Sequence, residues 1–252
     1  MYFSELKGKV VIVTGGNKGI GKEIALEFSK LGSSVIILGR DSKSLKATKN
    51  LLDKNSHGNL YFQLDINNIN KINECIDEIF EIYNRIDILV NNAGINIAKE
   101  AFEVTEEDWD SVLDTNLKSL FFISKAVGKK MKMTGGGKII NMASQMSYVG
   151  YVKRAAYGSS KGGVLQLTKA LAVEWAKYKI NVNAVAPTFV ETNLTQKMFK
   201  DKEFKKDVYS RILFEELPKP SDIVGGVLYL ASDLSKFVTR ETIKIDAGWT
   251  VM

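Results

Sequence analysis

The stretch “VVIVTGGNKGIGKEIALEFSKL” (residues 10–31) joins an apolar, β-branched run to a glycine-rich turn and then to a helical pattern. One face of the helical part collects apolar side chains at the spacing of an α-helix: Ile20, Ile24, Ala25, Phe28 and Leu31. Glycines between a strand and a helix let the backbone approach a pyrophosphate, and the first N–H groups of the helix point toward it. Their G-x3-G-x-G spacing alone is also compatible with a purely structural turn. The rest of the chain has to decide between these two interpretations.

The same alternation of strand and helix continues along the chain. Short apolar runs typical of strands follow at 35–38, 60–64, 87–90, 138–141, 180–185 and 242–245. Helical patterns occupy 43–55, 67–84, 105–133, 155–178 and 219–232. Apolar strands that alternate with helices are typical of a parallel sheet covered by helices on both faces. We expect an α/β protein in which residues 1–252 form a single domain, a doubly wound Rossmann fold with a seven-stranded, mostly parallel sheet.

The composition argues against several kinds of site. Of 252 residues, 45% are hydrophobic and 25% are charged, as in ordinary globular proteins. The one cysteine, Cys75, rules out an internal disulfide, and its helical apolar surroundings indicate a core position. The one histidine, His57, lies in the polar stretch “KNSHGN”, which indicates an exposed loop. Metal sites need clusters of ligands at set spacings, so we expect no metal.

Charge and hydropathy bear on partners and location. The net charge of +6 comes from lysines scattered over helix faces, without the interleaved aromatic residues of a single-strand binder. We therefore expect no nucleic-acid partner. The N-terminus leads straight into a strand, and no apolar run approaches the roughly 18 residues of a membrane helix. The sequence thus predicts a cytoplasmic protein with no membrane partner.

Polar residues follow the third and fourth strands, at the edge where a doubly wound sheet binds its ligands. “NNAG” (91–94) follows the fourth strand, so that Asn91 and Asn92 would brace the turn. Ala93 and Gly94 would leave room for a flat ligand, although such turns are also common without one. Asp65, followed by Ile66, comes after the third strand and would either accept from an adenine amine or cap the next helix.

Ser144 follows the fifth strand on that same edge, and “YGSSK” (157–161) opens the next helix. The four-residue spacing places Tyr157 and Lys161 on one helical face. A phenol has a pKa of about 10, and a nearby ammonium lowers it, so the pair suits a proton donor with its tuning cation. The alternative is an amphipathic helix that happens to carry both residues. No histidine partners Ser144, which argues against a serine-nucleophile triad.

A known family shares these motifs. The chain resembles the short-chain dehydrogenase/reductase family, in order and over its whole length, through “TGGNKGIG”, “NNAG”, “DTNL” (114–117), Ser144, “YGSSK” and “NAVAPTFVET” (183–192). The stretches “NNAGIN”, “EEDWDSVLDTNL” and “LAVEWAKYKINVNAVAPTFVET” look most like the gluconate 5-dehydrogenase branch and are also similar to β-ketoacyl-acyl-carrier-protein reductases. Two positions depart from the family pattern, because Thr188 and Arg240 stand where glycine is common.

The resemblance implies a catalytic tetrad of Asn116, Ser144, Tyr157 and Lys161. In the family, the tyrosine protonates the developing alkoxide, the serine orients the carbonyl and the asparagine holds a water that links the lysine to solvent. The resemblance also implies a nicotinamide dinucleotide, bound by Gly15, Asn17, Lys18, Gly19, Ile20, Gly21, Arg40, Asp65, Ile66, Asn92, Ala93, Gly94, Tyr157, Lys161, Pro187, Thr188, Val190 and Thr192. A homotetramer is the assembly that the family suggests.

The end of the second strand bears on which nucleotide binds. A carboxylate there hydrogen-bonds the ribose of NAD, whereas a cation favours the 2′-phosphate of NADP. Arg40 occupies the tip of the strand, and Lys18 adds a second positive charge near the same phosphate. In the alternative, Asp41 is the ribose acceptor, although Asp41 also suits a helix cap. We expect NADP(H), with NAD(H) as the alternative.

Residues 188–216 interrupt the alternation after the sixth strand and contain two short, highly charged helical pieces. Each piece nonetheless has one apolar face, formed by Leu194, Met198 and Phe199 in the first and by Phe204, Val208 and Ile212 in the second. Such a segment suits a lid over the site, and two permanently packed helices are the alternative. The expected substrate pocket consists of Ser144, Gln145, Met146, Tyr151, Tyr157 and Phe189.

We therefore expect an NADP(H)-dependent oxidoreductase that interconverts a carbonyl and a secondary alcohol on a small molecule, namely a sugar acid, a polyol or a small ketone. One alternative is a 3-oxoacyl-acyl-carrier-protein reductase, whose acidic carrier protein the +6 charge would attract. An alternative of another class is a nucleotide-sensing or scaffold protein that has lost catalysis. The presence of both Tyr157 and Lys161 argues against it, although fold alone does not establish function.

Overall fold

Seven strands form one sheet in the computed structural model, which describes residues 3–214 and 216–251. Their order across the sheet is β3-β2-β1-β4-β5-β6-β7, and each neighbouring pair is parallel. The strands are β1 (Val10–Thr14), β2 (Ser34–Gly39), β3 (Leu60–Gln63), β4 (Ile88–Asn91), β5 (Gly137–Met142), β6 (Ile180–Pro187) and β7 (Thr242–Ile245). The expected doubly wound sheet is confirmed, and its described strands are all parallel rather than mostly so.

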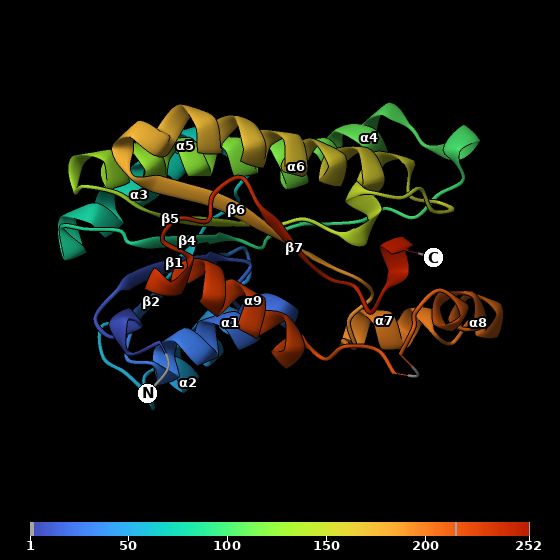
Figure 1. The fold of residues 1–252 in the computed structure, drawn as a ribbon, viewed down its shortest axis with the longest axis horizontal. Coiled ribbons are helices and arrows are strands. Elements are labelled where there is room, and N and C mark those ends of the chain that lie inside the picture. Colours follow the sequence, from blue (N-terminus) through green and yellow to red (C-terminus); the bar gives the residue numbers. More distant parts are fainter. Residues whose placement is uncertain (1–2, 215, 252) are drawn as a thin grey trace.

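Helices cover both faces of the sheet (Figure 1). One face carries α1 (Gly19–Lys30), α2 (Ser42–Leu52) and α9 (Pro220–Ala231). The other carries α3 (Ile69–Tyr83), α5 (Ser119–Met133) and α6 (Ala155–Trp175), with α4 (Glu106–Leu113) at its outer end. The short helices α7 (Asn193–Met198) and α8 (Lys202–Ser210) project beyond one end of the sheet, close to the C-terminus.

The strands are apolar because both of their faces are buried. In β1, Val11 and Val13 contribute to the core beneath α1 and α9, while Val10 and Ile12 contribute to the core beneath α3 and α5. This alternation is the two-residue period of a strand with a hydrophobic layer on each side. Cys75 also lies in the second core, and His57 is exposed, as expected from the sequence.

The connection after β3 determines where a ligand can bind. The chain builds β2 and β3 on one side of β1 and then returns to place β4 on the other side. Consecutive crossovers therefore diverge between β1 and β4, which leaves a crevice beyond the carboxyl ends of these strands. The residues that follow β1, β4, β5 and β6 surround this crevice.

The predicted helix over 105–133 is interrupted. It begins with a capping box between Thr105 and Asp108, but α4 gives way to a π-helical turn, Asp114–Lys118, before α5 starts. The buried Asn116 in this turn hydrogen-bonds the backbone of Ile95 and the side chain of Ser160. These partners are distant in sequence, so helical periodicity could not reveal the π-helical turn, a feature that is frequent at functional sites.

Arg240, one of the two departures from the family pattern, lies in the turn before β7. Its φ of 68° is in the left-handed region, where a residue with a Cβ costs about 1–2 kcal/mol. The Arg240 N–H donates to the carbonyl of Val182 at 2.9 Å, so the turn keeps its connection to β6. The family's preference for glycine here thus has a backbone reason, and the turn forms despite the arginine.

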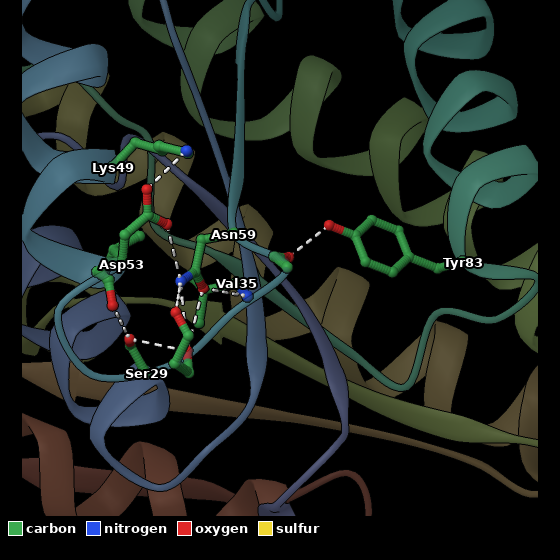
Figure 2. A network of polar contacts seen from close by, with 9 residues as sticks. Ser29, Val35, Lys49, Asp53, Asn59 and Tyr83 are labelled. Atoms are coloured by element: carbon green, nitrogen blue, oxygen red, sulfur yellow. Dashed lines mark hydrogen bonds and ion pairs between the residues drawn. The ribbon is translucent and has the colours of Figure 1, made fainter.

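A separate polar network lies at the opposite, amino edge of the sheet (Figure 2). Asn59, just before β3, accepts from the Val35 N–H at 3.0 Å and donates to Asp53 at 3.3 Å, while Lys49 pairs with Asp53 at 2.6 Å. Tyr83 donates to the carbonyl of Gly58 from α3. The network joins α2, α3 and the start of β3, so its role is to hold the scaffold.

The described part of the chain shows neither a metal-binding cluster nor a membrane-spanning helix. Within residues 3–214 and 216–251, no three His, Cys, Asp or Glu side chains gather as a metal site requires. No helix in that part of the chain has both the length and the apolar composition needed to cross a bilayer. Cytoplasmic location stays a prediction from the sequence.

Candidate active site

Thr14, at the end of β1, connects the glycine loop to the “NNAG” loop by hydrogen bonds. Its hydroxyl accepts from the backbone N–H groups of Asn92 and Ala93, both at 3.0 Å. The Asn92 side chain donates in return to the carbonyls of Thr14 at 3.0 Å and Gly15 at 3.3 Å. Asn92 therefore braces the two loops, as the sequence suggested. The contribution of Thr14 was missed, because nothing in a lone threonine beside a glycine turn signals it.

The glycine loop has the geometry that a pyrophosphate needs. Gly15 and Gly19 have φ values of 64° and 53°, which favour glycine. A Cβ on Gly21 would lie 2.3 Å from Nδ2 of Asn92, so no larger residue fits there. No side chain caps the start of α1, whereas Asp41 and Asn68 cap α2 and α3. The uncapped N–H groups of the first turn thus face the crevice at the helix end that attracts anions.

Arg40 follows β2, and Lys18 lies in the glycine loop at the start of α1. Arg40 and Lys18 are exposed, and no carboxylate oxygen of the described residues lies within 4.0 Å of either. Asp41 instead accepts from the backbone N–H groups of Lys43 at 3.0 Å and Ser44 at 3.2 Å, as the N-cap of α2. Asn17 donates to the Ser44 hydroxyl at 2.6 Å. The cap interpretation of Asp41 is confirmed, and the positive charges remain available to a ligand.

Asp65 and Ile66 lie after β3 on the same edge. One oxygen of Asp65 accepts from the Asn67 N–H at 3.0 Å, so this carboxylate shapes the turn before α3. Asp65 is exposed and Ile66 is half-buried. Contact of these residues with an adenine stays a prediction.

Asn116 and Lys161 meet beside Gly94. Oδ1 of Asn116 accepts from the Ile95 N–H at 2.8 Å, and Nδ2 donates to the Ile95 carbonyl at 2.9 Å and to Oγ of Ser160 at 3.0 Å. A Cβ on Gly94 would lie 3.1 Å from Oδ1 of Asn116 and 3.7 Å from Nζ of Lys161. The backbone of the “NNAG” loop therefore packs directly on two predicted catalytic residues.

Lys161 is enclosed on the inner face of α6. Its Nζ donates to the carbonyl of Met142 at 2.6 Å and lies 5.8 Å from the centre of the Tyr157 ring. Burial lowers the pKa of the Lys161 ammonium to about 8. The lysine is therefore positioned next to the phenol, with a proton that leaves close to neutral pH.

The pKa of Tyr157 is raised in the structure, whereas the sequence led us to expect a lowered value. Burial raises it above its usual value, while a hydrogen bond with Ser144 and the positive charge of Arg154 act in the opposite direction. The sequence predicted a lowered pKa with Lys161 as the cause. Instead, the Lys161 ammonium is directed to the Met142 carbonyl, desolvation of the phenol dominates, and Arg154 is the cation that opposes it.

Ser144 and Gln145 form a buried pair at the end of β5. The Ser144 hydroxyl accepts from the Met146 N–H at 3.2 Å and lies 2.9 Å from Oε1 of Gln145, to which it donates. The Ser144 hydroxyl is thus oriented by the two residues that follow it. Gln145 reaches the site through this serine.

The predicted substrate residues Met146, Tyr151 and Phe189 belong to one hydrophobic cluster. The rings of Tyr151 and Phe189 have centroids 6.0 Å apart, and Trp249 lies 5.6 Å from each. Trp249 could not be predicted from the sequence, because the C-terminal turn reaches this cluster only through the tertiary fold.

The predicted lid packs on the same cluster. Val208 and Ile212 are buried in it, and Met198, Phe199 and Phe204 are half-buried against it; the Leu194 side chain lies outside the described residues. Tyr151 donates to Asp207 at 2.6 Å, and Arg211 pairs with Asp207 at 3.0 Å while its guanidinium lies over the rings of Tyr151 and Trp249. The two helical pieces are confirmed, and movement of the segment stays a prediction.

The segment after β6 completes the crevice. Pro187 ends the strand, Val190 is buried, and Thr192 approaches the glycine loop, since its methyl would lie 4.0 Å from a Cβ on Gly19. Oγ1 of Thr188 is buried and has no hydrogen-bond partner among the described residues. A buried hydroxyl oxygen with no partner among the described residues, in the segment after β6, fits a polar group of a bound ligand.

Comparison with known proteins agrees over almost the entire chain. The family model described as enoyl-(acyl carrier protein) reductase matches residues 15–250. A 2-dehydro-3-deoxy-D-gluconate 5-dehydrogenase of Escherichia coli K12 is 38% identical over 247 residues, covering 97% of this chain and 96% of the relative. An NAD-dependent glycerol dehydrogenase of Listeria innocua is 38% identical over 245 residues, covering 96% and 94%. A solved structure from Beutenbergia cavernae, assigned as an NAD(P)-dependent gluconate 5-dehydrogenase with NADP bound at low occupancy, has a TM-score of 0.92 at 33% identity and covers 98% of both chains.

Proposed function

Because the chain belongs to the short-chain dehydrogenase/reductase family, we propose that it interconverts a carbonyl and a secondary alcohol with NADP(H), on a sugar acid, a polyol or a small ketone. Its family makes it an NAD(P)-dependent oxidoreductase that acts on the CH–OH group of a small molecule. The nucleotide preference, the substrate and the roles of individual residues are the parts that we propose.

The convergence of Asn116, Ser144, Tyr157 and Lys161 carries the proposal. These residues come from the π-helical turn, the end of β5 and α6; Asn116 and Lys161 lie beside Gly94, and the Tyr157 ring centre is 5.8 Å from Nζ of Lys161. Asn116 and Lys161 are buried, and each has specific hydrogen-bond partners. A purely structural origin would not explain why Asn116, Ser144 and Lys161 are all buried at the edge where ligands bind.

In the proposed reaction, a bound nicotinamide supplies or accepts the hydride. Tyr157 donates a proton to the carbonyl oxygen, and its raised pKa keeps this proton in place at neutral pH. Ser144 donates a hydrogen bond that orients the carbonyl, once its proton turns from Gln145 to the substrate. Lys161 stabilises the phenolate that remains and can return a proton to it, because the pKa of the lysine is about 8.

The surrounding residues fit a dinucleotide. The free first turn of α1 suits the pyrophosphate, and Thr188 offers a buried hydroxyl at the nicotinamide end. Arg40 after β2 and Lys18 in the glycine loop have no ion-pair partner among the described residues, and we propose that both face the 2′-phosphate. We propose that the remaining contacts are those expected from the sequence, along the glycine loop, the “NNAG” loop and the segment after β6.

The Tyr157→Phe variant tests the catalytic assignment. It removes one hydroxyl, so carbonyl-dependent oxidation of NADPH should fall by at least ~100-fold, the lower end of general-acid effects. The dissociation constant of NADPH, measured by fluorescence, serves as the control and should change little. An unchanged rate would show that Tyr157 is not the proton donor. Tight NADPH binding with no turnover by the wild type, over a broad panel of carbonyls, would instead favour a nucleotide sensor.

The Arg40→Asp variant tests the nucleotide preference. Loss of a charged hydrogen bond to phosphate should weaken NADPH binding by roughly 1.5–3 kcal/mol, while NADH should bind as well or better. Lys54→Asp, in an exposed loop at the opposite edge of the sheet, is the matched control for charge. Equal losses for both nucleotides would mean that Arg40 has a structural role.

A second candidate is the reduction of a thioester-linked ketone on an acyl carrier protein. Similarity to a 3-oxoacyl-[acyl-carrier-protein] reductase of Thermotoga maritima, 36% identical over 250 residues, favours it, and the net charge of +6 would attract an acidic carrier. The rate on carrier-bound substrate should then fall as salt is added, because screening removes the attraction. A rate that is independent of salt would count against this candidate.

A further inference from the structure

Arg154 is a buried cation with no acidic partner among the described residues. It immediately precedes α6, and only 6% of its surface is exposed. Its side chain donates one hydrogen bond among the described residues, from Nη1 to the neighbouring carbonyl of Lys153 at 3.0 Å. A guanidinium has five N–H donors and keeps its charge in proteins. Most of its hydrogen-bonding capacity is thus unused in a position where an unpaired charge is costly.

Two acidic side chains contact residues that are close to Arg154 in the sequence, and both are already paired. Glu100 pairs with Lys153 at 3.3 Å, and Asp207 pairs with Arg211 and Tyr151. No carboxylate of the described residues lies within 4.0 Å of the Arg154 guanidinium. Neither neighbouring acid compensates its charge.

The position of Arg154 connects it to the substrate side of the site. It lines a cavity of about 330 Å³ together with Met146 and Tyr151, two of the predicted substrate residues. Arg154 is the single charged residue among those that line this cavity in the described part of the chain. Its positive charge acts on the phenols of both Tyr151 and Tyr157. The cavity therefore places a cation beside two predicted substrate residues, and Gly158, which follows the proposed proton donor in α6, also lines it.

We propose that Arg154 binds the carboxylate of the substrate, so that the protein acts on keto acids and hydroxy acids in preference to neutral ketones and polyols. The planar guanidinium matches a carboxylate with two parallel hydrogen bonds, which compensates the buried charge. A neutral polyol offers no such compensation. The inference rests on the proposed oxidoreductase function, and it selects one substrate class within it.

Two simpler roles compete with this one. Arg154 could hold the loop that precedes α6, but its side-chain bond within the described residues goes only to the adjacent residue, which anchors little. It could also serve only to stabilise the Tyr157 phenolate, through the charge noted above. An electrostatic effect on Tyr157 would change reaction rates on every substrate alike, whereas a carboxylate site distinguishes acids from neutral compounds. The experiment therefore measures the ratio of kcat/KM for an acidic substrate to kcat/KM for a matched neutral one.

The kinetic test uses 5-keto-D-gluconate and L-sorbose, which share the same keto end and hydroxyl stereochemistry but carry a carboxylate and a CH2OH group, respectively, at the far end. For Arg154→Met, the ratio of kcat/KM for the acid to that for the neutral sugar should fall by about 10- to 100-fold, the range for loss of a charged hydrogen bond. Arg154→Lys should retain part of the preference. Lys153→Met, an exposed neighbour with the same charge, should leave the ratio unchanged. An equal fall on both substrates, with the ratio preserved, would overturn the proposal.

A binding measurement separates this inference from the proposed reaction. Calorimetry with D-gluconate in the presence of NADP+ should show binding that Arg154→Met weakens by the same factor, and D-sorbitol, the matched neutral compound, should bind more weakly to the wild type. This result would support the carboxylate site even if neither sugar were turned over. Equal affinities of the wild type for gluconate and sorbitol would overturn it, whatever the rates show.

Discussion

Burial pushes Tyr157 and Lys161 toward their neutral forms. It raises the pKa of the phenol and lowers that of the ammonium, and the two groups lie on successive turns of α6. The phenol therefore holds its proton at neutral pH, as a donor to a carbonyl oxygen must. The pKa of the Lys161 ammonium is about 8, so this group can lose and regain a proton near neutral pH. The position of the pair followed from the sequence, whereas the effect of burial required the structure.

The buried Lys161 should make stability depend on pH. Its pKa is about 8 in the folded protein and about 10.4 in an unfolded chain, so the unfolded state binds more protons between these values. The contribution of this group to the free energy of unfolding therefore rises from pH 8 to pH 10, by at most about 3 kcal/mol. Denaturant unfolding of the wild type minus that of Lys161→Met, measured from pH 7 to 10, isolates this contribution. Parallel curves for the two proteins would mean that the ammonium is well solvated.

At the scale of elements, α7 and α8 are attached to the body by few polar contacts. Tyr151 donates to Asp207, Arg211 lies over Tyr151 and Trp249, and the Leu213 N–H donates to the Ala247 carbonyl at 2.8 Å. The apolar faces predicted from the sequence do pack inward, onto Phe189 and Met146. A segment held to the body by one small hydrophobic cluster and these few polar contacts among the described residues is of the kind that opens locally.

The Tyr151→Phe variant should make α8 open more often. It removes the hydrogen bond to Asp207 and leaves the ring packing in place, so hydrogen exchange across 202–210 should rise by about 3- to 10-fold for a loss of roughly 0.5–1.5 kcal/mol. Tyr209→Phe, on the same helix, is the matched control. In the wild type, NADPH with a substrate analogue should increase protection across 190–214. Strong protection that neither ligand nor Tyr151→Phe changes would identify the segment as fixed structure.

The elements themselves were predictable where local pattern decides them. The apolar runs of β1 and β2 and the helical face of α1 appear in the structure within one or two residues of the predicted bounds. The local sequence pattern did not predict features that depend on contacts between residues distant in the sequence. The π-helical turn depends on the partners of Asn116, and Trp249 reaches the site only through the fold. Arg154 lies three residues before Tyr157, so helical spacing was a signal for it, but its burial was not visible from the sequence.

At the scale of the whole molecule, the outer face of the layer formed by α5 and α6 is the candidate subunit interface. A largely apolar groove there is lined by Leu113, Leu117, Phe121, Leu167 and Ala170, with four other residues. The α5–α6 layer lies on the side of the sheet away from α1 and α9 (Figure 1). An apolar surface of this extent suits a subunit interface, and a self-complementary contact between equivalent helices would generate a two-fold axis. Two such axes build the homotetramer that we expect from the sequence.

Light scattering on the purified protein tests the assembly. The wild type should have four times the chain mass of 28.0 kDa. Ala170→Glu places a charge on the exposed rim of the groove and should reduce the mass to that of a dimer or monomer, because a carboxylate buried in an apolar contact is unfavourable. Ala47→Glu, the same substitution at an exposed position of α2, should leave the mass unchanged. A wild-type mass of 28.0 kDa would refute the tetramer, and a tetrameric Ala170→Glu variant would show that this face is not an interface. The active-site crevice opens at the carboxyl edge rather than on this helical face, so a tetramer built this way leaves the path of the substrate free.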